Sequence, residues 1–152
     1  MSVRSLSFCL TLTLALIGAR TVFAGDFFEQ DGVALRGYDP VAYFTDNKPE
    51  KGLAKYAYEY KGSKFLFASA KNEQAFATNP EKYAPQFGGF CAFGTANGVK
   101  ATTQPDAFSV VDGKLYLNHD TNVQKRWKED VDGNISLGEK NWPEVSKAPL
   151  MH

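Results

Sequence analysis

The sequence predicts an α+β fold: a small single domain in which two β-hairpins pack against helices, following a cleavable signal peptide. Two stretches of alternating aromatic or apolar residues, each interrupted by a short glycine-containing turn, predict the hairpins. Helix-capping residues that precede apolar stretches predict the helices. A short apolar run close to the first methionine predicts the signal peptide.

Residues 1–24 have the pattern of a secretory signal peptide. Arg4 supplies a positive charge, and residues 6–17 form an apolar run that is shorter than the ~20 residues needed to span a bilayer. Residues 22–24 then offer a site for signal peptidase. We therefore expect cleavage near Ala24 and a periplasmic or secreted protein.

The mature chain, residues 25–152, has the length of one domain, with a core expected at about 36–143. Removal of Arg4 and Arg20 changes the formal net charge from zero to about −2. Because no basic patch remains, nucleic acid is excluded as a partner. No second apolar run has membrane-spanning length, so we expect no membrane span in the mature chain.

The first part of the mature chain predicts turns and then a hairpin. Residues 26–37 read as a polar lead-in, and residues 41–44 as either a short strand or a helical turn after Asp39 and Pro40. Aromatic residues then alternate on both sides of the turn at Lys61, Gly62 and Ser63. This period places them on one face of a hairpin, and they are Tyr56, Tyr58, Tyr60, Phe65 and Phe67.

A helix follows this hairpin. Ser69 can cap a helix over residues 70–79, which Pro80 ends because the residue before proline avoids helical backbone. Residues 81–83 add a short turn. Residues 88–98 are rich in glycine and aromatic residues, which indicates irregular or partly helical structure.

The last part predicts a second hairpin and two helices. Residues 108–111 and 114–118 flank Asp112 and Gly113, a pair that favours a type I′ turn. Asp120 can cap a helix whose buried stripe is spaced by four residues and which we expect to end at Gly133; the stripe is Val123, Trp127 and Val131. Residues 135–142 read as a short helix stopped by Pro143, and the tail as loose.

Several stretches in this order resemble the YHS-domain family, and most closely its small exported bacterial members. Residues 37–44 read Gly-Tyr-Asp-Pro-Val-Ala-Tyr-Phe, and the other matching stretches are 60–69, Phe76 with 79–83, 88–92 and 112–118. The resemblance implies a small α+β module. It also implies metal binding, because some YHS domains accompany copper-transporting ATPases. In metal-linked members a cysteine follows the Asp-Pro-Val element and further cysteines end the hairpin; here those places hold Ala42, Tyr43 and residues 67–69.

Cys91 is the first candidate functional residue, because it is the only cysteine outside the expected signal peptide. An internal disulfide is therefore excluded from the mature chain. A thiolate can bind copper or zinc or act as a nucleophile, whereas a buried free cysteine simply packs like a small apolar residue. The sequence leaves both interpretations open.

Four further residues are candidates. His119 would join Cys91 as a metal ligand, since we expect the second hairpin to pack near the loop that begins at Gly88. Tyr38 and Asp39 lie on a turn, where binding residues concentrate, and Gly89 allows close backbone approach to a ligand.

The leading hypothesis is a periplasmic YHS-domain protein that binds a small ligand or a transition metal, copper or zinc, at or near Cys91. One alternative is a non-catalytic module that binds another protein of the cell envelope. A second is a thiol-dependent redox protein or enzyme that uses Cys91, and the sequence favours a protein that is not an enzyme because it has no pattern for a partner base.

Overall fold

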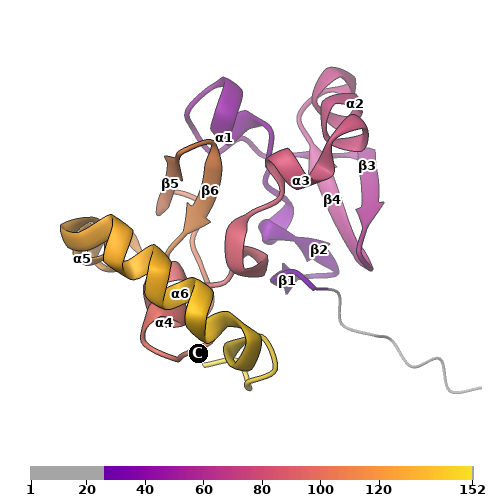
Figure 1. The fold of residues 1–152 in the computed structure, drawn as a ribbon. Helices are drawn as coiled ribbons and strands as arrows, with labels where there is room; N and C mark the ends of the chain where they lie inside the picture. Colours follow the sequence, from indigo (N-terminus) through magenta and orange to yellow (C-terminus); the bar gives the residue numbers. More distant parts are fainter. Residues whose placement is uncertain (1–25, 152) are drawn as a thin grey trace, which may run out of the picture.

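Three antiparallel hairpins and six α-helices alternate along residues 26–151, the part of the chain that the computed structural model describes (Figure 1). The predicted signal peptide lies outside these residues. The strands are β1 (Glu29–Gln30), β2 (Val33–Ala34), β3 (Leu53–Tyr60), β4 (Ser63–Phe67), β5 (Phe108–Val111) and β6 (Lys114–Leu117). The helices are α1 (Ala42–Thr45), α2 (Ala70–Thr78), α3 (Pro80–Tyr83), α4 (Ala92–Ala96), α5 (Thr121–Trp127) and α6 (Val131–Val145), with 3₁₀ turns η1 (Leu35–Gly37), η2 (Gln86–Gly89) and η3 (Lys128–Asp130). The α+β prediction is confirmed.

The predicted polar lead-in is wrong, because residues 26–37 form a third hairpin that belongs to the core. Glu29 pairs with Ala34 and Gln30 with Val33. The flanking apolar side chains are buried, namely Phe27, Phe28, Ala34 and Leu35. These scattered apolar positions do not alternate over a long enough run to predict strands.

The first predicted hairpin is present as β3 and β4, with Tyr58 opposite Phe65 and Tyr60 opposite Ser63. Lys61 and Gly62 have φ angles of 47° and 78°, as the tight turn requires. Phe65 and Phe67 are buried, and the tyrosines of β3 pack against the same apolar cluster. The alternating pattern therefore predicted correctly which face of this hairpin is buried.

The caps predicted for the helices are also present. Ser69 Oγ accepts a hydrogen bond from Asn72 N at the start of α2, and Asp120 Oδ1 accepts from Val123 N at the start of α5. The stretch that read as either strand or helical turn is the helix α1.

Two predicted helix boundaries near the C-terminus are wrong. The helix that begins after Asp120 ends at Trp127, and Gly133 lies in the first turn of α6, where its N–H donates to Asp130 Oδ1 over 3.0 Å. A capping aspartate therefore starts a new helix at the point where the apolar spacing predicted continuation.

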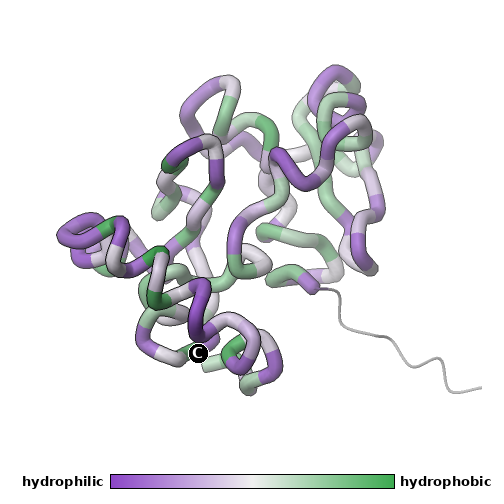
Figure 2. Tube along the Cα trace, in the orientation of Figure 1, coloured by the Kyte–Doolittle hydropathy of each residue, from purple (hydrophilic) through white to green (hydrophobic). Residues whose placement is uncertain are grey.

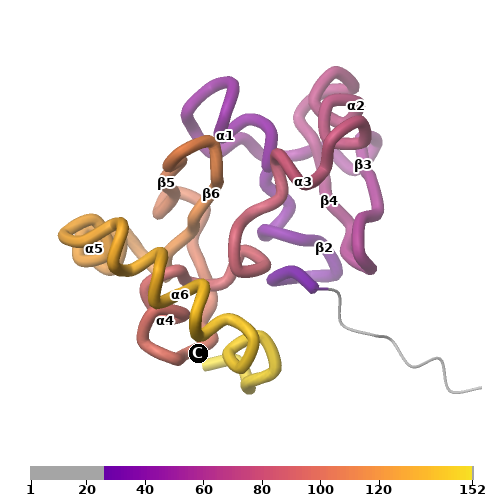
Figure 3. Tube along the Cα trace, in the orientation of Figure 1, coloured from indigo at the N-terminus to yellow at the C-terminus, as the bar shows by residue number. Residues whose placement is uncertain are grey.

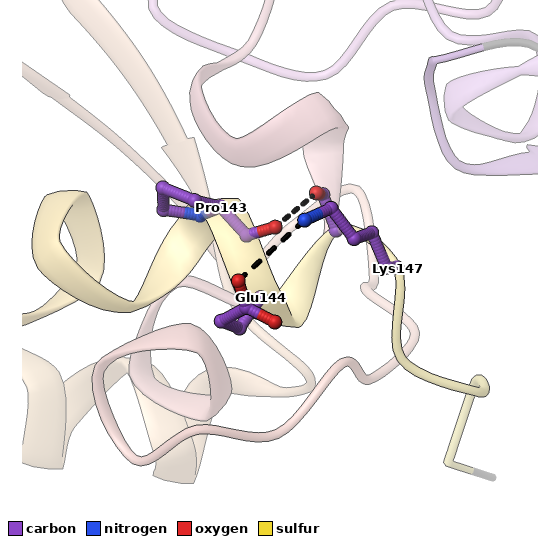
Figure 4. A network of polar contacts seen from close by, with 4 residues as sticks. Pro143, Glu144 and Lys147 are labelled. Carbon is purple, nitrogen blue, oxygen red and sulfur yellow. Dashed lines mark hydrogen bonds and ion pairs between the residues drawn. The ribbon is translucent and has the colours of Figure 1, made fainter.

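Pro143 does not stop α6, which continues to Val145. Proline removes one backbone donor, but the next turn closes through Ser146 N and Trp142 O at 2.8 Å. The last turn is closed locally by a hydrogen bond from Ser146 Oγ to Pro143 O and by an exposed contact of 3.5 Å between Lys147 Nζ and Glu144 Oε1 (Figure 4).

The tail after α6 is tied down rather than loose. Met151 N donates to Lys100 O over 2.7 Å, and Ala101 forms a parallel bridge with Met151. Figure 3 follows the chain from β1 through the three hairpins to this end beside α4 and α6.

The buried side chains form two apolar clusters, and Figure 2 shows hydrophobic residues along the chain in both regions. The first cluster joins the β3–β4 hairpin, α1 and α2. The second joins α4, α5, α6 and η2 around Trp127. Strand β6 serves both, because Leu115 and Leu117 face the first cluster and Tyr116 faces the second.

Within residues 26–151, no helix is both long and apolar enough to cross a bilayer.

Candidate functional site

An open cleft of about 780 Å³ lies between the β3–β4 turn, the η2 turn and α6. This volume falls in the range typical of small-molecule sites. Its walls come from segments far apart in sequence: the β3–β4 turn and α3 on one side, and α6 with the segment after α4 on the other.

Aromatic rings form the apolar part of the cleft. Phe87 and Phe90 are mostly buried and lie 5.8 Å and 6.2 Å from the Trp142 ring, centroid to centroid. Phe27 and Tyr60 contribute from the other side, with 5.9 Å between their centroids. Tyr60 and Trp142 are half-buried, so their rings keep exposed surface against which a planar ligand can stack, and the buried rings hold them in place.

The η2 turn that carries Phe87 has left-handed backbone. The φ angles of Phe87, Gly88 and Gly89 are 51°, 59° and 77°, and a bulky residue such as phenylalanine seldom adopts such a value. Gly88 O accepts a hydrogen bond from Phe28 N over 2.7 Å, and a Cβ on Gly88 would lie 2.4 Å from Asp26 O. Only glycine therefore fits at position 88, at the edge of the cleft.

Charged side chains occupy both ends of the cleft. At one end are Asp26, Lys61 and Glu81, and at the other are Lys100 and Glu139. Lys100 Nζ lies 4.5 Å from the centre of the Phe90 ring and donates to Ser146 O over 2.9 Å. Partial burial lowers the pKa of Lys100.

Cys91 lies outside this cleft lining, and its side chain is buried, with 2% of its surface exposed. Its Sγ caps α4 by accepting a hydrogen bond from Gly94 N over 3.3 Å. Burial raises the pKa of the Cys91 thiol, and the backbone N–H groups of Gly94, His119 and Phe93 oppose that rise without cancelling it. The thiol is therefore mostly protonated near neutral pH, which makes it a weak nucleophile.

Asn118 is the polar side chain beside this sulphur. It is fully buried; its Oδ1 accepts a hydrogen bond from Phe93 N over 3.0 Å and lies 3.7 Å from Cys91 Sγ. Its Nδ2 has no hydrogen-bond partner among the described residues. The second hairpin does pack near the Gly88 loop as predicted, because Cys91 forms a parallel bridge with Leu117.

The imidazole of His119 is exposed, and its Nδ1 lies 3.2 Å from Thr102 O and 3.3 Å from Thr102 Oγ1. Among residues 26–151, no group of three or more His, Cys, Asp and Glu side chains lies close enough to hold a metal ion. A closed zinc site needs four protein ligands, and a catalytic one needs three. The described donors around Cys91 are therefore too few for a zinc site of either kind.

Asp39 is a buried structural acceptor. Its Oδ1 accepts from Val41 N at 2.8 Å and Ala42 N at 3.3 Å, and its Oδ2 accepts from Ala68 N at 2.8 Å and Asn72 Nδ2 at 2.7 Å. These four bonds join the start of α1 to the end of β4 and the start of α2. They use the lone pairs that a ligand would need.

The contacts of Tyr38 and Gly89 are also with neighbouring protein groups. Tyr38 bridges to Lys51, whose Nζ lies 4.6 Å from the ring centre. Gly89 is buried, and a Cβ there would lie 2.5 Å from Leu35 Cδ2. None of the five predicted site residues lines the aromatic cleft.

The cleft is what sequence reasoning missed. The run from Gln86 to Phe90, with aromatic residues around two glycines, marks one wall and was visible in the sequence. Nothing in the sequence connects that run with Lys100 and Trp142, because their approach depends on how α6 packs across α4 and η2.

One comparison with known proteins, that with family models, gives a match. Residues 41–87 match the family model named YHS domain. No curated protein and no solved structure matches the chain. The matched segment runs from α1 to η2 and supplies one wall of the cleft, whereas Phe90, Lys100 and Trp142 lie beyond it.

Proposed function

Because residues 41–87 of this chain form a YHS domain, we propose that the protein is a YHS-domain binding module that holds a small organic ligand in the aromatic cleft. The observation that carries the proposal is the cleft itself: about 780 Å³, with Phe87, Phe90 and Trp142 packed along it and charged side chains at both ends. Small-molecule sites combine apolar or aromatic surface for contact with polar groups that fix the orientation of the ligand, and this cleft has both.

The function proposed is binding rather than catalysis. The one described thiol is buried, its pKa is raised by that burial, and it lies outside the cleft lining. A cysteine enzyme needs the opposite setting, an accessible thiol whose pKa is lowered. This favours a protein that is not an enzyme.

Binding of copper or zinc through Cys91 and His119 stays a prediction. We favour the organic ligand because, among the described residues, no group of three or more His, Cys, Asp and Glu side chains lies close enough to hold a metal ion. Titration of the reduced protein with Cu(I) and Zn(II), beside Cys91→Ser, tests the metal separately. Binding to an envelope protein also stays a prediction.

Export is part of the proposal. It is supported by the signal-peptide pattern of residues 1–24. Cell fractionation followed by N-terminal sequencing tests it. We expect a periplasmic or secreted product that begins at Gly25, and a cytoplasmic product that keeps residue 4 would contradict export.

The binding experiment uses 2-naphthamide, a neutral planar aromatic probe, titrated into the purified protein while probe fluorescence is recorded. Trp142→Ala removes a ring from the cleft, and we expect it to weaken probe binding about fivefold, since stacking on one aromatic ring contributes about 1 kcal/mol. Leu137→Ala is the matched control, because Leu137 lies on the same helix, is 49% exposed and does not line the cleft. Saturable binding that Trp142→Ala leaves unchanged, or no saturable binding at all, would contradict the proposal.

A further inference from the structure

We infer that the ligand of the cleft is an aromatic monoanion, with its ring against Trp142 and its carboxylate or similar group on the Lys100 ammonium. The inference rests on the proposed function, and it adds the chemical class of the ligand. Two observations support the inference: the contacts that hold Lys100 in place, and the different surroundings of Lys61, the second lysine in the cleft.

Lys100 is fixed at its end of the cleft. Its backbone carbonyl accepts a hydrogen bond from Met151 N over 2.7 Å, so the tied C-terminal tail anchors this residue. Its Nζ lies 4.5 Å from the centre of the Phe90 ring and donates to Ser146 O over 2.9 Å. The ammonium is thereby positioned next to the rings that line the cleft.

The ammonium of Lys100 has donors to spare. Lysine carries three N–H donors, and Ser146 O is the one acceptor that the described residues provide for them. The ion pairs found within residues 26–151 join Lys48 to Glu50 and Lys147 to Glu144, so no described carboxylate pairs with Lys100. Burial lowers its pKa with no opposing contribution from an acidic neighbour. A bound anion would supply the missing charge and acceptors.

Lys61, at the opposite end of the cleft, is in a different situation. The pKa of Lys61 is raised, first by a hydrogen bond with Tyr60, and Glu81 and Asp26 add to the rise. Because these two carboxylates already act on Lys61, its end of the cleft has less attraction for a ligand anion than the Lys100 end.

Glu139 limits the charge that the ligand can carry. It lines the cleft on α6, one turn before Trp142, and it is exposed. Its carboxylate would repel a dianion such as a phosphate monoester more strongly than a monoanion. A single carboxylate on a planar ring therefore fits the cleft better than a phosphate does.

Three probes of nearly the same shape test the charge. We compare 2-naphthoate, 2-naphthamide and 2-naphthamidine, which are anionic, neutral and cationic at pH 7. In the purified wild-type protein we expect naphthoate to bind at least about tenfold more tightly than naphthamide, and naphthamidine to bind most weakly. The difference should shrink as salt is added, because the contact lies at an open cleft.

Substitutions then show which lysine causes the preference for naphthoate over naphthamide. Lys100→Gln should bring naphthoate to the affinity of naphthamide, while leaving naphthamide binding within about twofold, and Lys100→Arg should keep most of the preference. Lys61→Gln, the matched control inside the same cleft, should change the ratio by less than about threefold. Because each result is a ratio between two probes on one protein, a general loss of stability does not imitate it.

The outcomes separate the two proposals. If none of the probes binds, the proposed function fails and this inference fails with it. If the neutral probe binds and naphthoate shows no advantage, or if Lys61→Gln removes the advantage and Lys100→Gln does not, the binding function stands and the assignment to Lys100 is overturned.

Discussion

The two apolar clusters of this protein differ in how they are assembled. In the first, Phe76 of α2 contacts the rings of the preceding hairpin, at centroid distances of 4.9 Å to Phe65 and 5.2 Å to Phe67. In the second, Trp127 of α5 lies 5.3 Å from Tyr116, while the rings of Phe87 and Trp142 come from distant segments. The ring contacts of Phe76 therefore join segments that follow one another in the chain, although the first cluster also includes Leu115 and Leu117 of β6. The ring contacts of Phe87 in the second cluster join segments that are separated in the chain.

This difference follows the family match. The segment that matches the YHS domain, residues 41–87, contains the hairpin and α2 of the first cluster. Most of the second cluster is built by residues beyond the match. The cleft is lined from both parts of the chain, because its lining includes Phe87 at the end of the matched segment and Trp142 of α6 beyond it.

Removing the central ring of the first cluster should have the largest effect. Phe76 is fully buried and lies within 6.0 Å, centroid to centroid, of four other rings, so we expect Phe76→Ala to lower the free energy of unfolding by about 3–5 kcal/mol. Urea unfolding followed by circular dichroism measures it. Leu137→Ala, at a position that is 49% exposed, should stay within about 0.5 kcal/mol. A loss below about 1 kcal/mol at Phe76 would mean that the first cluster is not the main source of stability.

A substitution at Gly88, in the η2 turn, should have the next largest effect on the free energy of unfolding. Gly88→Ala forces a side chain onto a backbone with φ of 59° and places its Cβ 2.4 Å from Asp26 O, so we expect a loss of about 2–3 kcal/mol. Gly98→Ala is the matched control: its φ is 77°, and nothing lies within 4 Å of the added Cβ. It should therefore cost only the backbone strain, about 1 kcal/mol. Equal losses at the two glycines would show that the contact between η2 and Asp26 is not tight.

The β3–β4 hairpin and α2, which follow one another in the chain, are also the part that the sequence predicted well. Alternating tyrosines and phenylalanines predicted the β3–β4 hairpin and its buried face, and Ser69 predicted the start of α2, because each depends on residues within a few positions. The hairpin β1–β2 was missed because each of its strands has only two residues. Gly133 and Pro143 gave wrong helix ends because Asp130 restarts the helix and the next turn tolerates the proline.

The site could be predicted far less well than the fold. Cys91, His119, Tyr38, Asp39 and Gly89 were chosen for residue type and turn position, and the described contacts of all five are with neighbouring protein groups. Residue type does not reveal that Asp39 accepts four hydrogen bonds. The cleft depends on how α6 packs across η2, a contact between segments some fifty residues apart.

Ionisation of Cys91, which precedes Ala92 of the second cluster, should have the smallest effect on the free energy of unfolding. Burial raises the pKa of the folded thiol, so the unfolded chain ionises first, near pH 8.5. The stability that comes from keeping the thiol protonated is therefore complete below about pH 8.5 and is lost as pH rises through the folded pKa. Wild type should lose stability relative to Cys91→Ala across that window, by less than about 1.4 kcal/mol per pH unit.

Urea midpoints measured from pH 7 to pH 10 with a reductant present test this, and taking the difference between the two proteins cancels the tyrosines and lysines that titrate in both. Alkylation gives an independent check, since a thiol with 2% exposure should react with iodoacetamide far more slowly in the folded protein than in urea. Rapid alkylation of the folded protein at pH 7, together with a difference in stability that grows below pH 8.5, would identify an activated thiolate. That result would indicate that any catalytic activity depends on Cys91 and its surroundings rather than on the cleft.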